Sequence, residues 1–285
     1  MKEGNDLSLF SGRKNYAENI YIGKFFVGFI AYILLVHTVF NFTNLISSLE
    51  ISEIWGVFMF EVFVYAVPIV VYVVLKKESL KTLFPCEPVK LKTVLLLLGL
   101  AISSSLALST LMVAIVGILG HSSTDIPFLI QVIGDGYPFY VVFLLFGVST
   151  AILAELLFRG IVCNELKFFN LRKSAIINGV FFASISTFLV PSVEVAIVTL
   201  VGGFLLAYAF HYTKNIFVPI ALHLIHAVIA IGSAYILQEL EENAVEYIMF
   251  TETATEDIIM SIITGVFFTI IFVFLARKFV RNITI

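Results

Sequence analysis

Long apolar runs dominate this chain, and they restrict it to the few folds that a lipid bilayer admits. A helix needs roughly 20 mostly apolar residues to cross the hydrocarbon core. The sequence holds eight such runs, two of them shorter than the rest, joined by polar connections. Hydrophobic residues make up 60% of the chain and charged residues 13%, and the mean hydropathy is +1.05. This composition lies far outside that of ordinary soluble domains. The pattern predicts an all-α, polytopic membrane protein with eight transmembrane helices.

The expected spans, each correct to within a few residues, are Ile20–Asn41, Ile54–Leu75, Val94–Leu119, Pro138–Phe158, Ser174–Val190, Val195–Tyr212, Ile216–Leu237 and Ile258–Ala276. Residues 1–19 are polar and mixed in charge, which argues against a removed signal peptide. We expect the first span both to target and to anchor the protein. Small residues, Gly179 in the fifth span and Gly202 and Gly203 in the sixth, favour close helix packing.

The basic residues are distributed on one side of this eight-span arrangement. All 17 lysines and arginines lie before or at the start of the first span, in every second connection after it, or beyond the last span. The remaining connections carry acidic residues and no basic ones. Because basic residues accumulate in cytoplasmic loops, we expect both termini to be cytoplasmic. Adding or removing one span would scatter the basic residues over both sides, so the charge distribution supports the number of spans.

Two opposite charges, Glu155 and Arg159, lie one helical turn apart near the end of the fourth span. Charged groups at membrane depth are costly, so they persist where they pair, line a wet cavity or do chemistry. One interpretation is an intrahelical ion pair at a helix end. The other is an arginine that orients a glutamate facing a cavity. The sequence leaves both open.

Three further ionisable residues lie within the spans. His223 and His226 are three residues apart in the seventh span, and a zinc site there would need a third ligand, for which Glu155 is the sole candidate. Interior histidines are more often hydrogen-bonded than metal-bound, so no metal and no cofactor is expected. Glu61 lies mid-membrane in the second span without an evident partner and keeps a proton-coupled transporter or channel open as an alternative.

Three segments together resemble the motifs of a known family. Glu155–Gly160 is similar to the second half of an E-E-x-x-x-R-G motif, Phe182–Ser186 to F-x-x-x-H, and Pro219–Ala227 to P-I-x-x-H-x-x-x-N. Their order and their spans resemble the CAAX protease and bacteriocin-processing (Abi) family of intramembrane peptidases. In that family the first glutamate activates water, while histidines and the asparagine bind and polarise the scissile carbonyl.

The resemblance also shows what this chain lacks. Ala154 occupies the position of the first glutamate, Ser186 that of the second-motif histidine, and Ala227 that of the asparagine. Of the motif residues, Glu155, Arg159 and His223 survive. His226 is a candidate to donate a hydrogen bond in place of the asparagine. Each missing base or oxyanion donor costs ~10²–10⁴ in rate, so the chain as written is expected to be inactive.

The leading hypothesis is therefore a catalytically degenerate member of this family, a pseudoprotease similar to the lysostaphin-resistance-A-like proteins. The resemblance implies a partner that is another membrane or cell-wall-processing protein, in the plasma membrane of a Gram-positive-like bacterium; nucleic acid is not expected. The alternative is an active glutamate-dependent endopeptidase acting on a peptide or lipidated substrate, with Glu, His and Asn replaced in this chain. We expect Glu155→Ala to leave a pseudoprotease functional.

This interpretation divides the chain into four parts. They are a cytoplasmic tail (1–19), three spans without diagnostic residues (20–137), the CAAX-protease-like core (138–230), and a last part (231–285) that contains an acidic external loop, the final span and a cytoplasmic tail.

Overall fold

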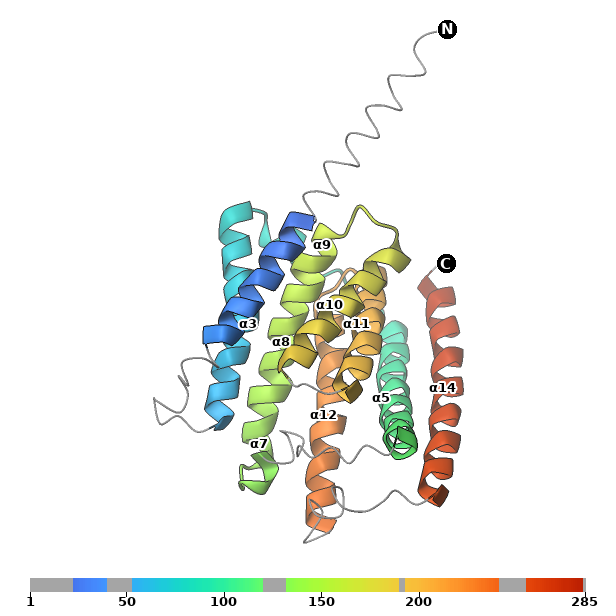
Figure 1. The fold of residues 1–285 in the computed structure, drawn as a ribbon. Coiled ribbons are helices and arrows are strands. Elements are labelled where there is room, and N and C mark those ends of the chain that lie inside the picture. The colour runs from blue at the N-terminus through green and yellow to red at the C-terminus, as the bar shows by residue number, and fades with distance from the viewer. Residues whose placement is uncertain (1–22, 40–52, 120–131, 190–192, 241–254, 284–285) are drawn as a thin grey trace.

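The fold was obtained as a computed structural model that describes residues 23–39, 53–119, 132–189, 193–240 and 255–283. Helices make up most of the described part, and it contains no strand, only one isolated β-bridge between Cys86 and Asn215. This confirms the predicted all-α class. The N-terminal tail and the acidic loop of the sequence analysis lie largely outside the described residues. Figure 1 shows the helices arranged as one bundle, with α8 near its middle.

The first helix of the described residues is Gly23–Val39. The later elements are α3 (Glu53–Lys76), the short α4 (Leu80–Leu83), α5 (Leu91–Leu119), α10 (Leu171–Leu189), α11 (Val193–Thr213), α12 (Phe217–Leu240) and α14 (Thr255–Ile283). Between α5 and α10 lies a continuous helical run, Phe139–Glu165. It consists of α7 (Phe139–Val142), the π-helical η1 (Phe143–Val148), α8 (Ser149–Glu155), the π-helical η2 (Leu156–Val162) and α9 (Cys163–Glu165).

Each predicted span falls on one of these helices. Within the described residues, six helices are long and apolar enough to cross a membrane, and Gly23–Val39 is a shorter apolar helix. The helix α10 is not among the six, because it begins with Arg172 and Lys173 and carries Asn178 in its middle. Helical length, apolar composition and the absence of strands from the described residues make this a polytopic all-α membrane protein.

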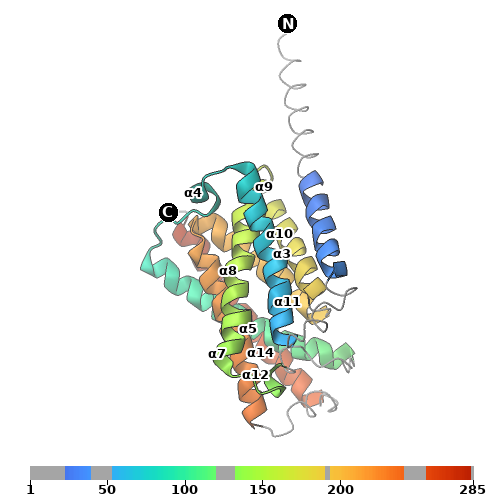
Figure 2. The same cartoon turned by 90° about the vertical axis from the view of Figure 1, so that its left-hand side faces the viewer.

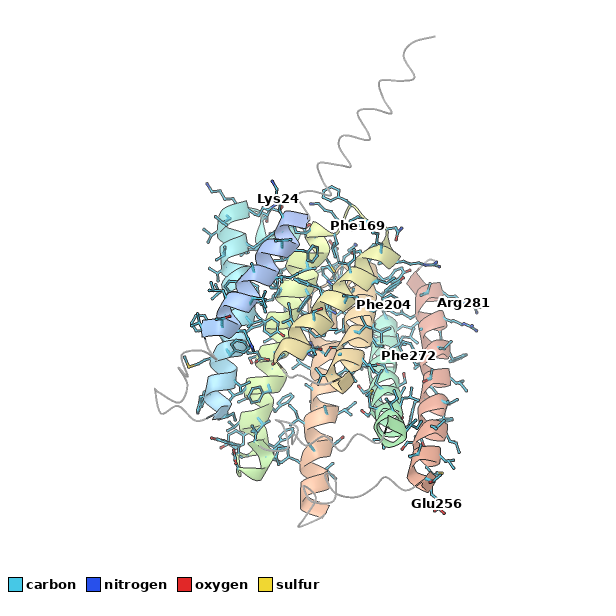
Figure 3. All side chains as sticks on the ribbon, in the orientation of Figure 1. Lys24, Phe169, Phe204, Glu256, Phe272 and Arg281 are labelled. Carbon is cyan, nitrogen blue, oxygen red and sulfur yellow. The ribbon has the colours of Figure 1, made fainter. Side chains whose placement is uncertain are left out.

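The helices alternate in direction, so that the basic residues gather at one end of the bundle. In Figure 3, Lys24 at the start of the first helix and Arg281 near the end of α14 lie toward the upper end, and Glu256 lies at the lower end. Figure 2 shows α5 and α14 tilted relative to α8, and these two helices pack along each other. The charge separation expected from the sequence is thus a property of the folded bundle.

The closest helix contact involves two glycines on α10 and α11. A Cβ atom added to Gly179 would lie 2.8 Å from the carbonyl oxygen of Leu200, and one on Gly203 would lie 2.9 Å from the Cα atom of Gly179. Both distances are shorter than any side chain tolerates, so the two backbones touch only because neither residue has a Cβ. The predicted packing role of Gly179 and Gly203 is confirmed. Gly202 has no atom within 4 Å of its added Cβ and does not share this role.

Replacing Gly179 by valine is expected to push α10 away from α11, because the added atoms meet backbone that cannot rotate aside. Overpacking of this kind costs typically about 1–3 kcal/mol, and thermal unfolding in detergent should show a lower midpoint. Gly202→Ala is the matched control, and we expect it to unfold at or slightly above the original temperature, since a helical glycine is less stable than alanine. Equal midpoints for the two variants would contradict the contact.

Candidate functional site

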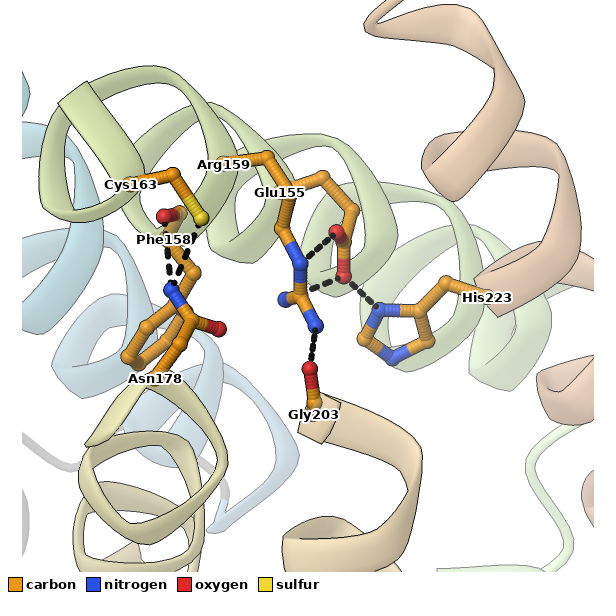
Figure 4. Close-up of polar contacts among 7 residues, drawn as sticks. All are labelled: Glu155, Phe158, Arg159, Cys163, Asn178, Gly203 and His223. Atoms are coloured by element: carbon orange, nitrogen blue, oxygen red, sulfur yellow. Dashed lines mark hydrogen bonds and ion pairs between the residues drawn. The ribbon is translucent and has the colours of Figure 1, made fainter. Parts of the chain in front are cut away.

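Glu155 and Arg159 form an ion pair at the junction of α8 and η2. The Nη1 of Arg159 donates to Oε1 of Glu155 over 3.0 Å, and its Nε lies 2.9 Å from Oε2. Both side chains are completely buried. Figure 4 shows the guanidinium and the carboxylate edge to edge. Of the two interpretations that the sequence left open, the ion pair is present, and it lies inside the bundle rather than at an exposed helix end.

Two other helices hold this pair. The Nη2 of Arg159 donates to the carbonyl oxygen of Gly203 on α11 over 2.8 Å. The Nδ1 of His223 on α12 lies 2.9 Å from Oε1 of Glu155. The close approach of α10 and α11 at Gly203 therefore lies beside the carbonyl that binds Arg159. The surviving motif residues, Glu155, Arg159 and His223, are thus brought together. Their contacts join the central helix (α8 and η2) to α11 and α12.

Aromatic rings enclose the pair on its sides. The Cζ atom of Arg159 lies 5.9 Å from the ring centre of Phe158 and 5.3 Å from that of Phe182. Phe182 and His223 form an edge-to-face pair, with 5.9 Å between their ring centres. Apolar surroundings strengthen the attraction between the charges and make an unpaired charge costly.

The helix that carries the pair changes its winding just after Glu155. The stretch Leu156–Val162 is π-helical, with hydrogen bonds spaced five residues apart, and such stretches occur frequently at functional sites. Asn178 on α10 is fully buried beside it and donates through Nδ2 to the carbonyl oxygen of Phe158 (2.9 Å) and to Sγ of Cys163 (3.2 Å). Sequence reasoning missed Asn178, although a buried amide in an apolar helix is itself a signal.

Gly160, which follows Arg159 in the motif, has a packing reason of its own. A Cβ at this position would lie 2.2 Å from the ring of Phe84, which follows α4. The glycine thus lets the α4 segment lie directly on η2.

Two of the three degenerate motif positions lie in apolar clusters. Ala154 is completely buried in an apolar cluster that includes Tyr65 and Ile185. Ala227 packs against a different apolar cluster, which includes Val142. Ser186 is partly buried, and its side chain interacts with the phenol of Tyr65.

His223 contacts Glu155 on α8, whereas His226 contacts α5. Its Nε2 lies 3.0 Å from Oγ of Ser104 on α5, and Ser104 also donates to the carbonyl of Ala101 over 3.0 Å. Ser104 thus joins α5 to α12. In the described ranges no three His, Cys, Asp or Glu side chains are grouped as metal ligands would be. A donor role for His226 in place of the asparagine stays a prediction.

Glu61 on α3 contacts the central helix α8. Its carboxylate accepts a hydrogen bond from Oγ1 of Thr150 on α8 (2.5 Å), so the partner that the sequence could not name is Thr150. Glu61 is 6% exposed, and its Oε2 has no hydrogen-bond partner among the described residues. A proton path through Glu61 stays a prediction.

Comparison with known protein families agrees with this geometry. Residues 136–229 match the model of the Rce1-like family, described as type II CAAX prenyl endopeptidases. The chain is therefore similar to that family over this stretch. No curated protein and no solved structure matched the chain in the corresponding comparisons.

The Rce1-like segment runs from just before α7 into α12. It contains the buried ion pair, His223 and the three degenerate positions, and it confirms the resemblance that the motifs indicated. The first helix, α3, α5 and α14 lie outside it.

Proposed function

We propose that this protein is a pseudoprotease that binds a partner protein in the membrane without hydrolysing it. The observation that carries the proposal is the state of Glu155, the surviving motif carboxylate. It is fully buried, and its Oε1 already accepts a hydrogen bond from Arg159 and contacts His223. A general base must reach the water that it activates, and this carboxylate serves the structure instead.

The degenerate positions support the same conclusion. Alanine at 154 offers no proton acceptor, and its surroundings are apolar side chains. Alanine at 227 offers no amide to a developing oxyanion, and its neighbours are apolar as well. The membrane scaffold of the Rce1-like segment is retained while the groups that perform the chemistry are absent.

The proposed partner is another membrane protein or an enzyme of cell-wall processing, and the proposed location is the plasma membrane of a Gram-positive-like bacterium. The basic end of the bundle, with Lys24 and Arg281, is proposed to face the cytoplasm, because lysine and arginine are retained on that side. Both termini would then be cytoplasmic.

The test must separate binding from hydrolysis without unfolding the protein. Glu155→Ala is unsuitable, because it would leave Arg159 buried with neither its counter-charge nor a hydrogen-bond acceptor at position 155. Glu155→Gln also removes the counter-charge and the basic carboxylate, but it keeps the shape and an amide oxygen that can accept from Arg159, and size-exclusion chromatography checks that it folds. We expect crosslinking in intact cells, followed by purification in mild detergent, to recover the same partner with the original protein and with Glu155→Gln.

The intact mass of that partner decides the chemistry. We expect one mass in cells that contain the original protein, the Glu155→Gln variant or no copy at all, together with loss of the partner's normal abundance or placement only when the protein is absent. A partner shortened by the original protein and not by Glu155→Gln would instead establish an active endopeptidase and overturn the proposal.

A further inference from the structure

A cavity of about 300 Å³ lies at the basic end of the bundle. Arg159 is part of its wall, and Glu155 is not among its lining residues. Its wall is formed by the segment after α4, by η2 and α9, by the first turns of α10 and by the end of α11. The polar side chains in the wall include Arg159, Asn164, Lys167, Ser174, His211 and Lys214. No glutamate or aspartate is among the described residues that line it.

Backbone hydrogen bonds hold the wall in place. The amide of Ile216 donates to the carbonyl of Pro85 (2.8 Å), and the amide of Glu87 donates to the carbonyl of Lys214 (3.0 Å). The side chain of Asn215 donates to the carbonyl of Glu87 (2.7 Å). The two connections, one after α4 and one after α11, are thus joined to each other beside the cavity.

Lys214 adopts a backbone conformation that lysine rarely takes. Its φ is +48°, in the left-handed region that follows a helix end and that glycine or asparagine occupies at lower cost. Among the described residues no hydrogen bond or ion pair involves its ammonium, and Lys214 lines the cavity together with Lys167.

The surrounding charges leave the cavity positive. Arg159 is neutralised by Glu155, and the carboxylate of Glu78 accepts a hydrogen bond from Asn164 (3.0 Å). The positive contributions come from Lys167, Lys214 and the start of α10. The first turn of α10 contributes Leu171 and Ser174 to the wall. The amino end of a 19-residue helix adds partial positive charge.

We propose that this cavity binds a phosphate-bearing anion through Lys214 and Lys167. Two sources share that chemistry: the headgroup of an anionic phospholipid, which reaches this end of the bundle from the surrounding leaflet, or a soluble phosphate compound. The volume accommodates a phosphate with its attached alcohol, and the ammonium groups and the helix end match its charge. The proposal is independent of whether the Rce1-like segment hydrolyses anything.

The experiment titrates the full-length protein in neutral detergent with two probes, phosphatidylglycerol and inorganic phosphate, and counts bound molecules by native mass spectrometry. Lys214→Asn removes the ammonium and keeps a residue that tolerates φ of +48°. The matched control is Lys77→Asn, because Lys77 has a φ of +52° just after α3, is exposed and does not line the cavity. Lys167→Gln is a second variant on an exposed residue.

We expect saturable binding of one probe, weakened about tenfold or more by Lys214→Asn or Lys167→Gln and unchanged by Lys77→Asn, since a hydrogen bond to a charged group is being removed. Binding of phosphatidylglycerol that phosphate does not displace identifies the lipid source, and binding of phosphate alone identifies a soluble one. Equal weakening by Lys214→Asn and Lys77→Asn, or no binding of either probe, would overturn the proposal.

Discussion

Arg159→Leu is expected to unfold this protein or to lower its thermal midpoint more than any other single substitution in the motif core. The substitution removes three contacts and leaves Glu155 buried without its counter-charge, with His223 alone beside it. Removing one partner of a buried pair costs about 3–5 kcal/mol. Size-exclusion chromatography and thermal unfolding in detergent measure the effect.

Two comparisons make the result specific. Arg281→Leu makes the same change at an exposed site near the end of α14 and should leave the midpoint nearly unchanged. The double variant Glu155→Gln with Arg159→Leu removes both charges and should recover part of the loss, because no ion is then left unpaired. A single Arg159→Leu variant as stable as the original would show that the pair does not support the fold.

Ala154→Glu, which restores the family's first glutamate, is expected to destabilise the protein and to produce no hydrolysis. The new carboxylate would enter an apolar cluster that contains Tyr65 and Ile185, at a position with no exposure. The existing charge of Arg159 is already matched by Glu155, so the added ion has no counter-charge, and an unpaired buried ion costs several kcal/mol.

Ala154→Gln is the control for this second prediction, because it adds nearly the same volume without the charge. We expect its midpoint to lie between those of the original protein and of Ala154→Glu. The prediction fails if Ala154→Glu is as stable as Ala154→Gln, or if it gains peptidase activity when combined with Ser186→His and Ala227→Asn.

The pseudoprotease interpretation depends on buried geometry rather than on missing letters alone. A carboxylate at 155 could serve as a base if it faced a wet cavity. It instead lies with Arg159 between Phe158 and Phe182 and joins α11 and α12 to the central helix. The proposed loss of chemistry is compatible with retention of the scaffold, because the surviving motif residues are those that hold helices together.

The amino-acid sequence by itself determined the class, the helices and the charge separation. Apolar length and the spacing of basic residues are local properties, and a bilayer leaves a chain of this composition little choice but helices. The pair of Glu155 and Arg159 could also be predicted, since residues four apart on one helix are neighbours before any tertiary contact forms.

Only the tertiary structure decided what surrounds that pair. The carbonyl of Gly203 and the side chain of Asn178 come from other helices, and the π-helical winding of Leu156–Val162 leaves no mark in hydrophobic periodicity. The cavity beside Lys214 needs three segments that are distant in sequence. Such features depend on how helices approach one another, and side-chain volume and backbone contact set that approach. The order of residues along one helix carries little information about it.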